Sequence, residues 1–208
     1  DRDGLTLVSM APNSETTGLR TALAMGAAKA VLVSDPTLAG AGALDTAKVL
    51  AAAIKRVEGA DLILAGTESS DGYTGTVPEQ IAAVLDLPSI TFAKSVEIVD
   101  GTVKVQRQTE AGYDECEAPL PALVSVTAGV VEPRDPSFKG IMAAKSKPVD
   151  TVTVADLGID AAIVGWSGAG QEIVDVAVAP AREAGEVFED DGTAAQKIVE
   201  FLDGLKVL

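Results

Sequence analysis

The stretch Asp61-Leu-Ile-Leu-Ala-Gly66-Thr-Glu-Ser-Ser-Asp-Gly-Tyr-Thr-Gly-Thr76 decides the fold of this chain. It begins with a short apolar run, Asp61–Gly66, which is typical of a strand that is covered on both faces. A polar, glycine-bearing loop follows, and Pro78 then stands where the first turn of a helix loses no hydrogen bond. The order of strand, loop and helix predicts one βα unit of an α/β protein.

The loop of this unit has the features of an anion site. Gly72 and Gly75 allow the backbone to approach a ligand closely, and the free N–H groups at the start of a helix attract negative charge. No Lys or Arg lies between Arg56 and Lys94, so amides and hydroxyls would have to hold any phosphate. An ordinary βα turn without a ligand fits the same residues, because short glycine patterns occur in many turns.

The chain upstream of this unit alternates between strands and helices. We expect a helix that is capped by Asn13 or Ser14 and ends at Gly26, between strands Leu5–Ser9 and Ala30–Val33. A second helix should have an apolar inner face made of Leu44, Ala47, Leu50, Ile54 and Val57. This alternation predicts a mostly parallel sheet with helices on both faces, on which ligands bind beyond the carboxyl ends of the strands.

The pattern changes to antiparallel strands after Leu87. The segment Val96–Val105 predicts a hairpin, because Asp100-Gly101 supplies the positive φ angles of a tight turn. Tyr113–Glu117 can pair back onto this hairpin, and Leu120–Val126 returns as a buried strand. We expect this β segment to be an insertion at one edge of the sheet.

The chain from Glu132 onward is less regular. Its patterns predict a short helix at Lys139–Lys147, a strand at Glu172–Val178 and a helix at Ala194–Leu205. We therefore expect two parts: an α/β domain over residues 1–150, which includes a loop at 132–145, and an extended C-terminal arm over residues 151–208. An arm with so little packing of its own often completes its packing on another chain.

Composition excludes several classes of function. The formal charge is −15 and aromatic residues make up 3% of the chain, which disfavours binding to nucleic acid or to an anionic membrane. The chain contains no histidine, so a Ser-His-Asp relay, a Cys-His pair and an imidazole metal site are all excluded. We expect no catalytic residues and no metal ligands.

Other features indicate a cytoplasmic protein. The single cysteine, Cys116, rules out an intrachain disulfide and fits a reducing compartment. No apolar run approaches the ~20 residues that span a bilayer, and the start of the chain does not look like a signal peptide.

Three segments together resemble the beta subunit of the electron transfer flavoproteins. They are the strand-loop-helix Asp61–Leu87, the segment Val103–Val124 with Arg107 and Gly112, and Glu132-Pro-Arg134 with Pro136–Ala144, which looks like the actinobacterial type. The resemblance runs from Leu5 to Leu208. It implies an adenine nucleotide alpha-hydrolase-like fold. The family's first strand and helix would precede Asp1, and only if they were absent from the protein would the sheet lose a central neighbour.

The resemblance also implies cofactors and their positions. A beta subunit of this family holds a structural AMP, and its alpha-subunit partner carries most of the contacts to FAD. By position, the AMP phosphate would be surrounded by Asp71, Gly72, Tyr73, Thr74, Gly75, Thr76 and Val77. Gly66 and the Met10 backbone would lie near the adenosine. Bifurcating members of the family place a second FAD at this site, and that alternative stays open.

The loop 132–145 is similar to the family's recognition loop, which docks partner dehydrogenases. Phe138 stands at the anchoring position, with Arg134, Ile141 and Met142 beside it, and a Phe folded back onto its own loop is the alternative. Arg107 and Arg182 match positions at the interface with the alpha subunit. Gln108 and Ala111 depart from the acidic residues common in the family, so an ion pair to the alpha subunit from that neighbourhood is not expected.

The function that this resemblance implies is electron transport. Electrons would pass from flavoprotein dehydrogenases, such as the acyl-CoA dehydrogenases of fatty acid oxidation, to a membrane quinone oxidoreductase. Two other classes remain as alternatives: a stand-alone adenine-nucleotide-binding module of the stress-protein type, and an enzyme that uses Tyr73 and Asp71 on a bound nucleotide.

Overall fold

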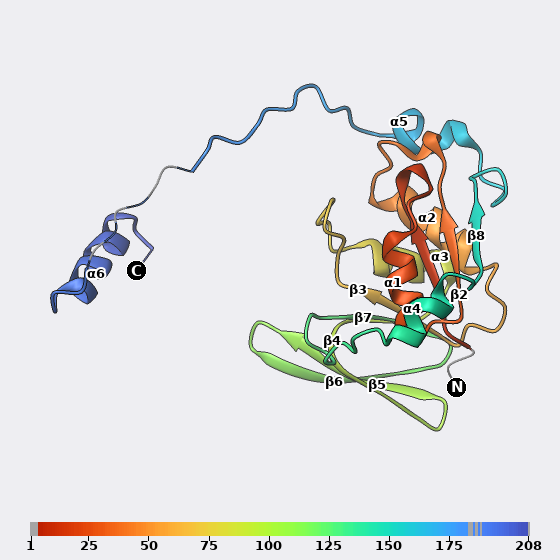
Figure 1. Cartoon of the computed structure of the whole chain (residues 1–208), viewed down its shortest axis with the longest axis horizontal. Coiled ribbons are helices and arrows are strands. Elements are labelled where there is room, and N and C mark those ends of the chain that lie inside the picture. The colour runs from red at the N-terminus through yellow and green to blue at the C-terminus, as the bar shows by residue number, and fades with distance from the viewer. Residues whose placement is uncertain (1–3, 183–184, 186, 188, 208) are drawn as a thin grey trace. The chain divides into compact units, whose positions relative to one another are not determined.

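The computed structural model describes residues 4–182, 185, 187 and 189–207 of the chain (Figure 1). Its contacts divide the chain into two compact units, Asp1–Glu172 and Ile173–Leu208. The boundary that the sequence suggested, at residue 150, lies inside strand β8 (Val149–Val152), which belongs to the first unit.

The first unit begins with a three-stranded parallel sheet, sheet A, in the order β1-β2-β8. Strand β1 (Thr6–Met10) leads through helix α1 (Thr17–Met25) to β2 (Lys29–Val33), and α2 (Ala43–Ile54) follows. Leu23 of α1 and Ala144 of α4 (Phe138–Ala144) pack on one face of this sheet. Val49 of α2 packs on the other face, so sheet A has helices on both faces as expected.

Helix α1 starts later than the sequence indicated. Asn13 and Ser14 do not cap it, because they lie in the 3₁₀ helix η2 (Pro12–Ser14), where their φ angles are +54° and +53°. The α-helix begins at Thr17, whose N–H donates to Glu15 Oε1 at 2.7 Å. An N-cap residue typically has extended backbone, which Asn13 and Ser14 in the left-handed region do not have.

The five-stranded sheet B has the order β3-β7-β4-β5-β6. Strands β3 (Leu62–Gly66), β7 (Ala122–Val126) and the start of β4 (Ser89–Val99) are parallel, whereas β5 (Thr102–Thr109) and β6 (Gly112–Pro119) are antiparallel additions at one edge. Asp100 and Gly101 have φ angles of +48° and +76°, which confirms the predicted hairpin turn. The predicted α/β class with an antiparallel β insertion is thus confirmed.

Strand β3 is not covered on both faces as the sequence suggested. Ile63 packs into the cluster that α2 and α3 (Val77–Leu85) form, but Leu64, which points to the opposite face, is 56% exposed. Strand β1 pairs only with β2, and β3 pairs only with β7, among the residues that the structure describes. The apolar run therefore predicted the strand correctly, but it did not predict which of its two faces is buried.

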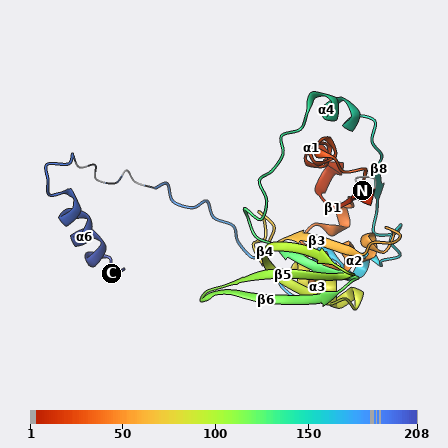
Figure 2. The same cartoon turned by 90° about the horizontal axis from the view of Figure 1, so that it is seen from below.

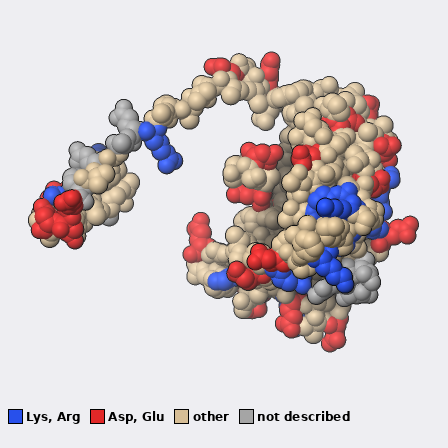
Figure 3. Space-filling model, in the orientation of Figure 1, with Lys and Arg blue, Asp and Glu red and all other residues tan. Residues whose placement is uncertain are grey.

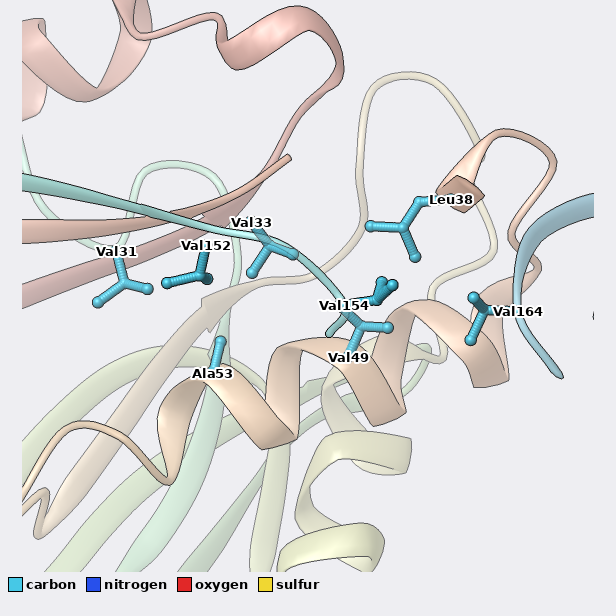
Figure 4. Packing of buried hydrophobic residues seen from close by; sticks show 8 residues of the cluster. All are labelled: Val31, Val33, Leu38, Val49, Ala53, Val152, Val154 and Val164. Carbon is cyan, nitrogen blue, oxygen red and sulfur yellow. The ribbon is translucent and has the colours of Figure 1, made fainter. Parts of the chain in front are cut away.

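Helix α2 is buried on two sides rather than one. Val49 and Ala53 join the core of sheet A, which Figure 4 shows around Val33 and Val152. Ala47 and Ala51 join the second cluster with α3 and sheet B. Leu44, predicted to face inward, is instead 50% exposed in the first turn of α2, so the predicted inner face is wrong at this residue.

The remainder of the first unit returns to sheet A. A long excursion after β7 carries helix α4, which lies beside α1 in Figures 1 and 2, before the chain enters β8. The 3₁₀ helix η4 (Ala161–Ile163) and the short α5 (Gly165–Gly168) follow. A 3₁₀ turn, η3 (Pro36–Leu38), precedes α2.

The second unit contains helix α6 (Ala194–Gly204), which confirms the predicted C-terminal helix. The predicted strand at Glu172–Val178 is wrong: these residues are outside any strand, and Val174, Val176 and Val178 are 88%, 83% and 96% exposed. Alternating valines favour an extended backbone, but a strand also needs a neighbour to pair with.

Candidate functional site

The loop between β3 and α3 is shaped by hydrogen bonds of its own residues. The Gly72 N–H donates to Asp71 Oδ1 at 2.7 Å and to Ser69 Oγ at 3.3 Å, and the Tyr73 N–H donates to Ser69 O at 3.3 Å. At the start of the loop, Thr67 Oγ1 donates to Val126 O at 3.1 Å, which ties it to the end of β7. The loop is thus a folded turn attached to sheet B.

Two residues of this loop have left-handed backbone. Tyr73 has φ of +49° and Gly75 has φ of +63°. A non-glycine residue in this region is uncommon and worth attention, and the Tyr73 side chain is 66% exposed. These two residues turn the chain just before α3, which begins at Val77.

The first turn of α3 leaves backbone donors available. Gln80 is the first residue to bond within the helix, through its N–H to Thr76 O at 3.2 Å. The N–H groups of Val77 and Glu79 therefore lie at the free end of the helix, where the helix dipole favours an anion. Thr76, at the N-cap position, makes no side-chain cap, and its Oγ1 instead accepts from Gln80 Nε2 at 3.2 Å.

The loop carries acidic side chains as well as donors. Hydrogen bonds from the Ser69 hydroxyl and the Gly72 N–H hold the pKa of Asp71 below its ordinary value, so this carboxylate is charged at neutral pH. Because it accepts from the Gly72 N–H, Asp71 shapes the turn. The donors left for an anion are the amides from Thr74 to the start of α3 and the nearby hydroxyls.

The residues that were predicted to bind the nucleotide follow or end strands of two different sheets. Asp71–Val77 form one continuous loop and helix start, and Gly66 is the last residue of β3 in sheet B. Met10 is the last residue of β1 in sheet A. Both residues thus end parallel strands at their carboxyl ends, where ligands of α/β sheets bind.

The second candidate region is helix α4, which presents apolar side chains to solvent. Ser137 caps the helix, since its Oγ accepts from the Gly140 N–H at 3.1 Å. Phe138 is 80% exposed, and Ile141 and Met142 are 44% and 50% exposed. Phe138 is therefore not folded back onto its own loop. The helix begins one residue before the predicted Lys139 and ends at Ala144, three before Lys147.

Basic residues gather around this helix although the chain as a whole is acidic. Residues 132–147 contain Arg134, Lys139, Lys145 and Lys147 against Glu132 and Asp135. Figure 3 shows blue atoms gathered over α1 and α4 on the face in view. Two basic residues that were not predicted as site residues, Arg20 and Lys147, link these helices. Only the side-chain hydrogen bonds reveal this link, since the two residues are 127 positions apart.

The two arginines expected at a subunit interface lie in different units. Arg107 of β5 lies 3.7 Å from Asp114 Oδ2 of β6 and 3.4 Å from Thr91 Oγ1, so its ion pair is within the chain. Arg182 is exposed in the second unit. The Trp166 ring lies over Gly40, and its backbone N–H donates to Ala39 O at 2.9 Å, but the residue remains 55% exposed.

The described residues contain neither a candidate membrane span nor a candidate metal site. None of their helices has the length and apolar character that crossing a bilayer requires. No group of three or more Cys, Asp or Glu side chains in the described part of the chain is arranged to hold a metal ion.

Comparison with known proteins identifies the family. The family model described as "Electron transfer flavoprotein domain" matches residues 2–157. The chain is 39% identical over 207 residues to the electron transfer flavoprotein subunit beta of Mycobacterium leprae, which covers 100% of this chain and 78% of the relative. The corresponding Megasphaera elsdenii protein is 36% identical over 202 residues, with 94% and 75% covered.

A third relative is named as a subunit of a reductase-Etf complex. The caffeyl-CoA reductase-Etf complex subunit CarD of Acetobacterium woodii is 34% identical over 192 residues, which cover 92% of this chain and 72% of that protein. The family model spans most of the first unit, and these alignments extend over nearly the whole chain. The chain therefore belongs to the electron transfer flavoprotein family, as a homologue of its beta subunits.

Proposed function

We propose that this chain is the beta subunit of a heterodimeric electron transfer flavoprotein. The observation that carries the proposal is the match to beta subunits over essentially the entire chain, arm included. The alpha subunit would carry most of the contacts to FAD, which supplies the redox chemistry when bound. This chain would brace the flavin-bearing partner and dock the dehydrogenases that donate electrons.

The arm is the part of the chain best suited to bind the alpha subunit. Helix α6 buries none of its residues within its own unit, and an apolar stripe of Ile198, Phe201 and the C-cap residue Leu205 is 54%, 63% and 57% exposed there. Residues spaced three, four and seven apart lie on one face of a helix. A partner surface would remove this stripe from water, and Arg182 would lie at the same interface.

The loop after β3 would hold AMP in this chain. Its donors fit a phosphate: the amides from Thr74 to Val77 stand at a helix start, and hydroxyls of Ser69, Thr74 and Thr76 are close in sequence. Gly72, Tyr73 and Gly75 give the turn its shape. No Lys or Arg side chain lies between residues 56 and 94 in the sequence. This fits a structural nucleotide held by backbone dipoles better than a site for phosphoryl transfer.

The apolar face of α4 would dock flavoprotein dehydrogenases. Phe138 would enter a groove on the partner, with Ile141, Met142 and Arg134 around it. An exposed aromatic residue beside basic side chains suits a site that anchors by burial and orients by charge. Acyl-CoA dehydrogenases would be the donors, and a membrane quinone oxidoreductase would receive the electrons.

Co-expression with the alpha subunit tests this function. The expected product is a heterodimer on size exclusion that releases FAD and AMP in equal amounts on denaturation. Release of FAD alone, at twice the amount, would place a second FAD in the loop. A homodimer that binds adenine nucleotide and does not bind the alpha subunit would instead support the stand-alone module. Hydrolysis of ATP or AMP would favour an enzyme that uses Tyr73 and Asp71.

A further inference from the structure

The carboxyl end of α4 is contacted by a cation of α1, and the carboxyl end of α1 is contacted by a cation just after α4. Arg20 of α1 donates from Nη1 to Ala144 O at 2.8 Å and to Lys147 O at 2.6 Å, at the carboxyl end of α4. Lys147, just beyond α4, donates from Nζ to Leu23 O at 2.9 Å and to Ala27 O at 2.6 Å, at the carboxyl end of α1. All four bonds are partly buried.

These bonds bring cationic donors to carbonyls at the carboxyl ends of both helices, where Leu23 O also accepts from the Gly26 N–H at 3.2 Å. The last carbonyls of an α-helix have no partner within it, and the dipole makes that end attractive to a cation. Leu23 and Ala144 belong to the last turns of α1 and α4. Hydrogen bonds that involve a charged donor are stronger than those between neutral groups. The pair therefore forms a reciprocal clamp, which we call the α1–α4 clamp: Arg20, Lys147 and the four carbonyls they reach.

Close contact of the two helices accompanies the clamp. A Cβ at Gly140 would overlap Ala24 O of α1, so only glycine lets α4 approach α1 at that point. At Gly18, also in α1, a Cβ would meet no atom within 4 Å. The contact thus requires glycine at one specific position of α4.

Helix α4 has little else to hold it in place. It contains seven residues, and Ala144 is its one buried residue. So short a helix is not stable alone in water. The side chain of Ala144 buries little apolar area, and such a contact does not fix the orientation of the helix. The four hydrogen bonds of the clamp are directional and do fix it. The clamp thus supplies directional contacts that fix the end of α4 on α1.

We propose that Arg20 and Lys147 are positioning residues for dehydrogenase docking: they fix α4 on α1 so that Phe138 points outward in a pre-formed orientation. The inference rests on the docking role of α4 proposed above. Pre-organisation lowers the entropy that a partner must remove on binding. Loss of the clamp should therefore weaken the encounter and leave the electron transfer step itself intact.

The test uses Arg20→Met and Lys147→Met in the full heterodimer. Backbone hydrogen exchange of residues 139–146, measured without a dehydrogenase, should become about tenfold faster in each variant. The KM for the flavoprotein as substrate of the dehydrogenase should rise several-fold while kcat and flavin content stay unchanged. Arg20→Lys and Lys147→Arg keep a cation and its donors, and should restore most of the protection and the KM.

Matched controls separate the clamp from charge and from general destabilisation. Lys145→Met removes a neighbouring exposed charge, and should leave the exchange rate of α4 unchanged. Gly140→Ala should speed exchange in the same segment, whereas Gly18→Ala should not. Melting of each heterodimer shows whether it is folded, and the conservative variants keep the test valid if a Met variant does not fold.

Each outcome decides the inference. Unchanged exchange in both Met variants would overturn the clamp, and faster exchange with an unchanged KM would overturn its role in docking. Phe138→Ala, measured in parallel, distinguishes a failure of the proposed function. If that variant also has a normal KM, α4 is not the docking element at all, whereas a raised KM with normal Met variants removes only Arg20 and Lys147.

Discussion

Replacing Phe138 by alanine should weaken the productive encounter with the dehydrogenase. An aromatic side chain has roughly 150–250 Å² to bury. Because Phe138 is 80% exposed, about 120–200 Å² is left for a partner, which corresponds to ~3–5 kcal/mol at ~25 cal/mol per Å². Ordering costs and imperfect packing reduce this value, so we expect a net loss of about 2 kcal/mol, or ~30-fold in kcat/KM.

The assay is steady-state electron transfer from an acyl-CoA dehydrogenase to the purified heterodimer, over a range of flavoprotein concentrations. Flavin content and the midpoint of thermal unfolding should stay as in the parent, because an exposed side chain contributes within about 0.5 kcal/mol to stability. The control is Ile98→Ala, which removes an apolar side chain that is 54% exposed on β4, away from α4. Equal kcat/KM for Phe138→Ala and the parent would refute the docking argument.

Three further outcomes can be measured on the same protein. Ser125→Ala should lower the free energy of unfolding by about 1–2 kcal/mol, because the Phe92 N–H loses its acceptor; an unchanged urea midpoint would contradict this. The hydrogen bond from the Thr37 N–H lowers the pKa of Asp35 in the folded chain. The ionised Asp35 therefore stabilises the fold at any pH above the ordinary pKa of an aspartate, and this stabilisation is lost as the pH falls through the lowered pKa of the folded chain. The melting temperature should therefore decrease once the pH is below about 4, and this decrease should be less steep in Asp35→Asn. Phe201→Asp should prevent assembly with the alpha subunit on size exclusion, and a normal heterodimer would rule out α6 as the contact.

Local sequence signals located most of the elements of the first unit. Asp100-Gly101 has the φ angles of a hairpin turn because these residue types tolerate the left-handed region. Pro78 marked the first turn of α3 for a similarly local reason. Signals that depend on neighbours were less reliable. The valines between Glu172 and Val178 have strand character, yet no described strand lies beside them.

The same distinction holds for the candidate sites. Phe138 could be singled out from its flanking residues and the family resemblance, and its exposure agrees with that choice. Ser137, the cap of α4, was a signal in the sequence that could have given the start of the helix. Arg20 carried no such signal, because its hydrogen bonds reach carbonyls more than 120 residues away.

The sequence by itself determined the α/β class, the βα unit around Asp61–Val77 and the absence of imidazole chemistry. These follow from periodicity, from turn residues and from composition, all of which act over a few residues or over the chain as a whole. Only the tertiary structure decided that α2 is buried on two sides, that Leu64 is exposed, and that Arg20 and Lys147 hold α4. Burial of a side chain and the identity of its hydrogen-bond partners depend on which distant segments meet in space, and a local sequence pattern does not specify these segments.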